Sequence, residues 1–332
     1  DWALIRRIML LSLPRTLSSS LSYITFIIMS ALATLLAVGS VSILQFSYNI
    51  QTTPLMIIGV SYAMAAFPTL TKHFAEGEHD KFATVLRESL RTLVFFSLPI
   101  TTLIIVLRAH IVRIILGAGA FSWNDTRLVA AALACFAISI VAQSAVLLLV
   151  RAFFAMGETK KPLKINAISF VITAVLAGGF LYLLSRNNAF HALVAATLRV
   201  GDLPYIAVVA LPFAFSIGQL VNAFLLWRAL RKAGVRKTVA LKRSVLNYCS
   251  VSVLAAVAAY GTLVIIGGAV RGKTFIEVFI QAALASIVGF GVYGYIMYAL
   301  RDPEMLQFLT AIRSKFWKPK EVPIVPEQNE VF

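Results

Sequence analysis

Long apolar runs separated by short polar segments make up most of the chain. Eight runs are each long enough to cross a bilayer, which takes roughly 20 residues of α-helix. They cover about Leu4–Val38, Ser40–His73, Lys81–Leu107, Trp123–Met156, Pro162–Leu184, Leu203–Lys232, Leu241–Gly267 and Thr274–Leu300. A helix satisfies its own backbone hydrogen bonds in lipid. The pattern therefore predicts an all-α, polytopic membrane protein with about eight transmembrane helices.

Two further stretches place apolar and basic residues on opposite helical faces. They run from Arg108 to Leu116 and from Met305 to Trp317. Helices of this kind lie in the membrane interface, so we predict two interfacial helices. The segment after Lys318 is rich in proline and charge, which predicts disorder.

Composition and charge support a membrane protein and argue against a nucleic-acid partner. The chain is 60% hydrophobic and 13% charged, with a mean hydropathy of +0.87 and a net charge of +16. If the N-terminus is cytoplasmic, 21 of the 30 lysines and arginines fall on inner loops and seven on outer ones. This bias predicts that both ends of the chain lie inside. The basic residues are then topology signals between apolar runs.

Catalytic and metal chemistry have little support in the sequence. Cys135 and Cys249 lie in apolar runs, as small core residues do. The four histidines lack metal-ligand spacing, and the residues show neither a nucleophile–base pair nor a glycine-rich phosphate loop. We predict a protein that is not an enzyme, with no cofactor and no metal.

Polar residues recur at helical spacing inside several of the apolar runs. The first run carries Arg15, Ser18 and Ser22, and the second carries Gln45, Asn49 and Thr52. Another arginine, Arg151, follows a polar pair in the fourth run. Such stripes either join helices by hydrogen bonds or line a shared water-filled cavity. We expect the cavity, with these seven residues as its substrate-binding positions.

Arg15 gives the strongest indication of the ligand. It lies about ten residues beyond Arg6 and therefore roughly 15 Å deeper at 1.5 Å per residue. No acidic residue is expected at the same depth, so an anion supplied from outside, such as a phosphate, would suit it.

Three segments resemble the MurJ (MviN) lipid II flippases. The first reads GAFSWNDT and begins at Gly119, and the second reads RAFFAMGETKKP and begins at Arg151. The third carries Pro54, Gly59, Val60 and Pro68 in the family's proline–glycine pattern. The matching motif positions are Gly119, Phe121, Asp125, Thr126, Arg151, Phe153, Thr159 and Pro162. The resemblance extends to about residue 235, and beyond it the match is in hydropathy and position.

The resemblance implies the C-terminal part of a MATE-like flippase fold. Residues 1–234 would form second-lobe helices, 235–302 two additional helices, and 303–332 the amphipathic helix and tail. It implies movement of lipid II, the lipid-linked peptidoglycan precursor, across the bacterial inner membrane by alternating access. The expected partners are lipid II, membrane lipids and a missing N-terminal lobe, which would agree with a first residue other than methionine.

One departure concerns the charge of the cavity. The family usually has an arginine five residues before the proline that matches Pro54, and this chain has Asn49 there. We hypothesise that Arg15, on the neighbouring helix, supplies that charge. The 108–116 segment would then act as an outer lid, and the last two spans would hold the lipid tail.

Two alternatives remain open. The chain could belong to another MATE-like exporter, of a different polyprenyl-linked sugar or a drug, although a drug exporter would more often carry an intramembrane carboxylate. It could also be a degenerate flippase that acts as a non-transporting membrane scaffold, which the uncharged Asn49 would permit.

Overall fold

The structure is a computed structural model that describes residues 2–117, 121–186, 188–201, 203, 205–235, 241–269 and 274–317. Side chains are described in these ranges except at 3–11, 14, 15, 19, 241, 242, 269 and 315–317. The described chain is helical, and its elements are α1 (Trp2–Thr34), α2 (Ser40–Leu55), η1 (Met56–Val60), α3 (Ser61–Ala75), α4 (His79–Leu116), α5 (Trp123–Ala137), α6 (Ser139–Ala155), α7 (Lys160–Leu184), α8 (Ala189–Leu198), η2 (Ile206–Val209), α9 (Ala210–Lys232), α10 (Leu241–Ala269), α11 (Phe275–Ala299) and α12 (Pro303–Trp317). The tail predicted to be disordered lies outside the described residues.

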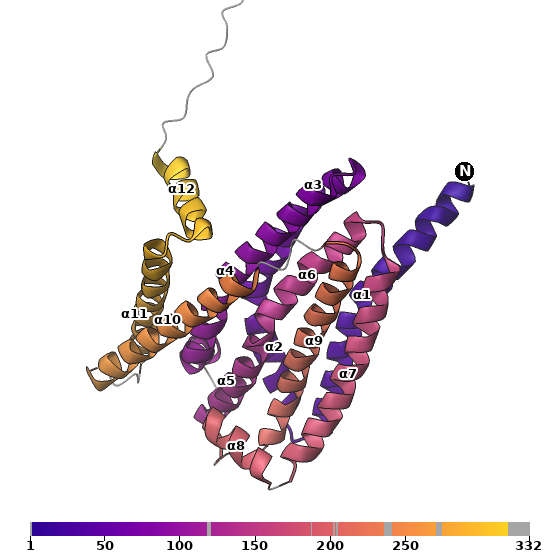
Figure 1. The fold of residues 1–332 in the computed structure, drawn as a ribbon. Coiled ribbons are helices and arrows are strands. Elements are labelled where there is room, and N and C mark those ends of the chain that lie inside the picture. The colour runs from indigo at the N-terminus through magenta and orange to yellow at the C-terminus, as the bar shows by residue number, and fades with distance from the viewer. Residues whose placement is uncertain are drawn as a thin grey trace, which may run out of the picture.

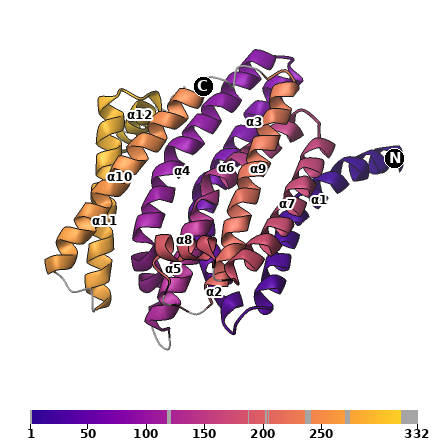
Figure 2. The ribbon, with the colours of Figure 1, turned by 60° about the horizontal axis from the view of Figure 1, so that its bottom comes forward.

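The predicted all-α, polytopic membrane fold is confirmed. Among the described residues, seven helical segments are long and apolar enough to cross a membrane, or eight if the bent pair α5–α6 forms one span. Helices α1 to α9 form the main bundle, and α10 and α11 pack along one side of it against α4 (Figures 1 and 2). Helix α12 follows α11 at one end of this side.

The second span continues through Pro54 without ending. Helix α2 passes into the π-helical turn η1 and then into α3, so that the span covers Ser40–Ala75. Proline cannot donate the backbone hydrogen bond of a helix interior, and π-turns often take up the resulting change in register. Gly59 of this turn lies close to α6, because a Cβ on it would be 3.2 Å from Ser144 Cα. The turn therefore fixes how closely the second span approaches α6.

The fourth predicted span is bent by 40° at Ile138, between α5 and α6. Two hydroxyl groups bind carbonyls next to the break: Ser216 Oγ donates to Cys135 O at 2.6 Å, and Ser139 Oγ donates to Phe136 O at 2.6 Å. Polar partners for freed carbonyls are what an interruption in lipid requires.

Among the described residues, one expected short helix is absent as a separate element, and one short helix is present that the sequence did not indicate. The segment from Arg108 to Leu116 is the continuous end of α4 and not a separate interfacial helix. Val112 in this segment is completely buried against the bundle, Ile111 and Ile114 are half-buried, and Ile115 is exposed. In contrast, the short helix α8 was not predicted, because its ten residues continue an apolar pattern without a strong polar face.

The predicted amphipathic helix after the last span is present as α12. Leu306, Leu309 and Ile312 are exposed on it. An exposed apolar row beside basic Arg313 is typical of a helix at a membrane interface.

Candidate functional site

Helix α2 presents two polar rows, one exposed and one buried. Gln45, Asn49 and Thr53 are exposed, whereas Ser47 and Gln51 are fully buried. The exposed row lies within an apolar span of 36 residues. Exposed amide side chains inside a span are costly against lipid, so this row marks a face that meets water, ligand or protein.

Thr52 and Arg151 are half-buried and bind their own helices. Thr52 Oγ1 donates to Tyr48 O at 2.8 Å and accepts a long hydrogen bond from Gln51. One guanidinium nitrogen of Arg151 donates to Leu147 O at 3.4 Å. These two residues therefore lie at the border between the bundle interior and its surface.

The polar stripe of α1 is divided between two environments. Ser18 is buried, and its hydroxyl accepts a hydrogen bond from Asn166 Nδ2 of α7 at 2.8 Å. Ser22 is exposed. In this structure Ser18 therefore joins α1 to α7, and Ser22 faces the bundle surface.

The Arg15 side chain lies outside the described residues, but its helix is placed. The rings of Phe26 on α1 and Tyr48 on α2 are 4.2 Å apart. The two helices are antiparallel. Arg15 lies eleven residues before Phe26 and Gly59 lies eleven residues after Tyr48, so Arg15 and Gly59 lie at the same level along the helix axes. Asn49 is then about 15 Å away along the axis at 1.5 Å per residue. This offset argues against the hypothesis that Arg15 takes the place of a charge at Asn49.

A buried amide network connects the second span to the break between α5 and α6. Gln143 Nε2 donates to Ser139 Oγ at 2.7 Å and to Gln51 Oε1 at 3.2 Å. Both glutamines are buried. Bonds of this kind hold helices together in lipid, so these polar positions have a packing role.

The first motif shapes the start of α5. Ser122 and Asp125 form a capping box, in which the Asp125 carboxylate accepts from Ser122 N at 2.9 Å and Ser122 Oγ accepts from Asp125 N. Thr126 Oγ1 donates to Ser122 O at 3.0 Å, and the Phe121 ring contacts Phe46 of α2 edge-on at 6.3 Å. Gly119 lies outside the described residues. Capping explains why Ser, Asp and Thr occur at this spacing.

The second motif forms the turn from α6 to α7. Phe153 is fully buried, and Gly157 has a φ of 73°, which favours glycine. Thr159 precedes α7 without a side-chain cap bond, and Pro162 lies buried in its first turn, where proline is tolerated. Glu158 pairs with Lys161 at 2.8 Å. These motif positions therefore have a local structural role.

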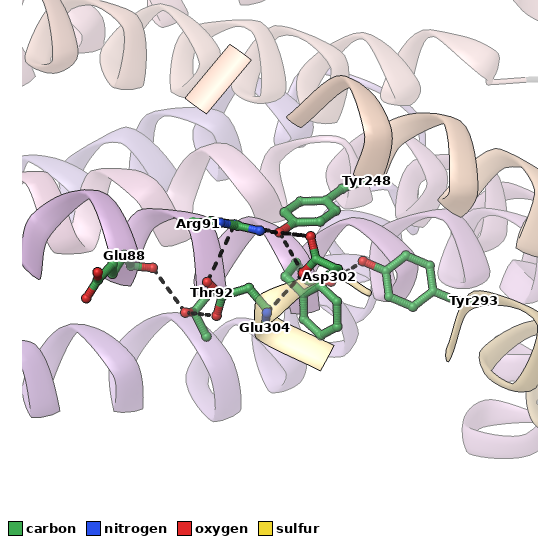
Figure 3. Close-up of polar contacts among 8 residues, drawn as sticks. Glu88, Arg91, Thr92, Tyr248, Tyr293, Asp302 and Glu304 are labelled. Carbon is green, nitrogen blue, oxygen red and sulfur yellow. Dashed lines mark hydrogen bonds and ion pairs between the residues drawn. The ribbon is translucent and has the colours of Figure 1, made fainter. Parts of the chain in front are cut away.

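A charged junction links α4, α10 and the start of α12, which sequence reasoning missed (Figure 3). Arg91 donates to Tyr248 Oη and to Asp302 Oδ2, each at 2.8 Å. Thr92 Oγ1 donates to Glu304 at 2.5 Å. Burial raises the pKa of the Glu304 carboxyl above its usual range. Arg91 and Asp302 are 211 positions apart in the sequence, so their opposite charges were the only sequence signal for this contact.

One group of possible metal ligands occurs among the described residues, namely His73, Glu76 and Glu78. The Glu78 carboxylate is already paired, with Lys81 Nζ at 2.6 Å and His73 Nδ1 at 2.7 Å. The hydrogen bond from Lys81, and to a smaller extent the one from His73, lowers the pKa of the Glu78 carboxyl. A lysine in the group opposes a cation, so the cluster is an ion-pair network.

These observations define a polytopic α-helical membrane protein whose second span has an exposed polar face. The chain belongs to the lipid II flippase MurJ family, because the family's sequence model matches residues 2–270.

Relatives and a solved structure agree with this assignment. The probable lipid II flippase MurJ of Bdellovibrio bacteriovorus is 24% identical to the chain, over 84% of the chain and 49% of its own length. The probable lipid II flippase MurJ of Rickettsia prowazekii is 31% identical, over 48% of the chain and 31% of its own length. The lipid II flippase MurJ of Burkholderia cenocepacia is 23% identical over 70% of the chain and 40% of its own length. The chain thus spans about half or less of these relatives.

The fold is also similar to a solved structure, a lipid II flippase MurJ in an inward closed conformation. The TM-score is 0.65 at 17% identity, over 89% of this chain and 55% of that one. The likeness extends the family assignment to the arrangement of the helices.

Proposed function

We propose that the chain forms part of a flippase that moves lipid II, the lipid-linked peptidoglycan precursor, across the bacterial inner membrane. The observation that supports this most is the exposed row of Gln45, Asn49 and Thr53 within an apolar span of a MurJ-family chain. A phosphorylated sugar head group needs such hydrogen-bonding groups to cross the hydrocarbon layer.

The exposed faces of α1 and α2 would meet the part of the flippase that the relatives have and this chain does not span. Arg15, Ser22, Gln45, Asn49, Thr52 and Arg151 are the proposed substrate-binding positions, with Ser18 supporting α1 from behind through Asn166. Because Arg15 and Asn49 are about 15 Å apart along the axis, we assign them to different parts of a long head group, with the anionic part at Arg15. Rocking of the two parts about this site would give alternating access.

Rescue of growth tests this function. A bacterium depleted of its own lipid II flippase receives the protein expressed from its complete gene. A flippase restores growth, whereas a non-transporting scaffold or an exporter of another compound leaves the cells to lyse. Lysis with the protein present in the membrane would contradict the proposal.

A further inference from the structure

A separate apolar pocket lies at the opposite end of the bundle from the charged junction of α12. Its volume is about 340 Å³, near the lower end of typical small-ligand pockets, which span roughly 300–1,000 Å³. Helices α4, α5, α7, α8 and α9 line it, and α8 runs across this end of the bundle (Figures 1 and 2). The pocket does not include any of the proposed substrate-binding positions.

The lining is apolar except at one charged residue. Of the thirteen lining residues, Arg108, Cys135 and Thr197 have hydrogen-bonding side chains, and Thr197 is satisfied by Leu193 O at 2.8 Å. Arg108 is half-buried, and its one hydrogen bond in the described chain is a long one of 3.4 Å to Ile105 O. No carboxylate pairs with it among the described residues. Its other donors therefore have no partner among the described residues, and the residue lines the pocket.

The pocket opens where the bundle would touch lipid. Ile138, at the break between α5 and α6, is 39% exposed, and Leu193 on α8 is 65% exposed. Both are apolar and line the pocket. A hydrocarbon chain could enter here directly from the bilayer, without passing through water.

The charge of Arg108 in the pocket lining favours one kind of occupant over another. A half-buried guanidinium without an anion carries a large desolvation cost. A neutral occupant would leave that cost in place, whereas a phosphate would pair with Arg108 by charge-assisted hydrogen bonds. Arg127 and Arg199 lie nearby around a second, open hollow lined by the other face of α8. The local charge therefore favours an anion.

We propose that this pocket holds one acyl chain of an anionic phospholipid from the surrounding bilayer, with the lipid phosphate paired to Arg108. The bound lipid would pack α8 against α5 and α9. The proposal concerns a lipid that stays in place and is independent of whether the protein moves lipid II.

Photolabelling in vesicles tests the proposal. The full protein is reconstituted in phosphatidylcholine vesicles with a trace of diazirine-bearing phosphatidylglycerol, or of phosphatidylcholine with the same chain. Mass spectrometry compares labelling of the 189–198 peptide with that of the exposed α10 residues Val257 and Ile265, which report general lipid contact. We expect the phosphatidylglycerol probe to label the α8 peptide about fivefold more than its zwitterionic counterpart, a typical gain from one partly exposed charge pair.

Three variants identify the contacts. Arg108→Gln should abolish the preference for phosphatidylglycerol, and Ala134→Phe should fill the pocket and remove labelling by both probes. If Ala134→Phe fails to accumulate, Val194→Phe tests the same space from the half-buried side of α8. The control Arg113→Gln removes a charge on the same helix that lies over the Trp123 ring, outside the pocket, and should change nothing. Equal labelling by both probes, or an unchanged preference in Arg108→Gln, would overturn the proposal.

Discussion

At the scale of single residues, the separation of Arg15 and Asn49 bears on the proposal that both positions bind the head group. The ring contact between Phe26 and Tyr48 fixes the register of α1 against α2. It places Asn49 about 15 Å from the level of Arg15. If both positions bind the substrate as proposed, they should contact different parts of the head group.

This separation predicts the outcome of a charge exchange. Arg15→Ala should weaken head-group binding by about tenfold or more, the usual effect of losing a hydrogen bond to a charged group, and should reduce growth rescue of a flippase-depleted bacterium. Adding Asn49→Arg should not restore it. Arg15→Lys, which keeps the charge, is the control. Full rescue by Arg15→Ala with Asn49→Arg would show that the charge can be moved and that the register is wrong.

Gly59 is a residue whose side chain must be absent. A Cβ there would meet Ser144 Oγ at 2.9 Å and Ser144 Cα at 3.2 Å. Gly59→Val should therefore destabilise the protein by about 1–3 kcal/mol through overpacking. The measurement is the midpoint of heat-induced thiol labelling in detergent, with Cys249 replaced by alanine so that the signal reports exposure of buried Cys135. Gly179→Val is the matched control, because a Cβ at this helical glycine has open space around it. Equal midpoints for the two variants would refute the close contact.

At the scale of elements, a charged junction holds the start of α12, in addition to the apolar contact of Phe308 with Phe96 of α4. Arg91 of α4 holds Asp302, whose Oδ1 also accepts from Glu304 N at 3.0 Å at the start of α12. Tyr248 of α10 binds the same carboxylate at 3.1 Å. One aspartate thus ties three helices together (Figure 3).

Amide hydrogen exchange in α12 tests this junction. Asp302→Asn weakens a partly buried pair with Arg91 and should raise exchange across residues 303–314 several-fold, while exchange in α2 stays constant. Glu304→Gln should leave α12 protected, because it keeps an acceptor for Thr92 without the charge that burial disfavours. Unchanged exchange in Asp302→Asn would show that the apolar face alone positions α12.

The same junction has a predicted pH dependence. The docked state raises the pKa of Glu304, so the protonated form is the one that docking favours. This contribution is greatest at low pH and is lost as the pH rises through the raised pKa. Exchange in α12 should therefore slow as the pH falls toward that pKa, after correction for the intrinsic rate, and this slowing should be absent in Glu304→Gln.

At the scale of the whole molecule, apolar run lengths were enough to predict the fold class and most spans. The period of the polar residues, however, did not distinguish a cavity wall from a helix contact. Gln45 and Gln51 are six residues apart on one helix, yet one is exposed and the other is fully buried against Gln143. Which side faces a neighbour depends on the packing of distant helices, as does the pairing of Arg91 with Asp302.

The account depends on water reaching the exposed row of α2 inside the membrane. The direct measurement is thiol labelling by a membrane-impermeant maleimide in inner-membrane vesicles, with Cys135 and Cys249 first replaced by alanine. Asn49→Cys should react readily, because maleimide needs a hydrated thiolate. Val257→Cys, an exposed apolar position on α10, and the fully buried Leu44→Cys should remain unlabelled. Labelling of Asn49→Cys as slow as that of Val257→Cys would contradict the account.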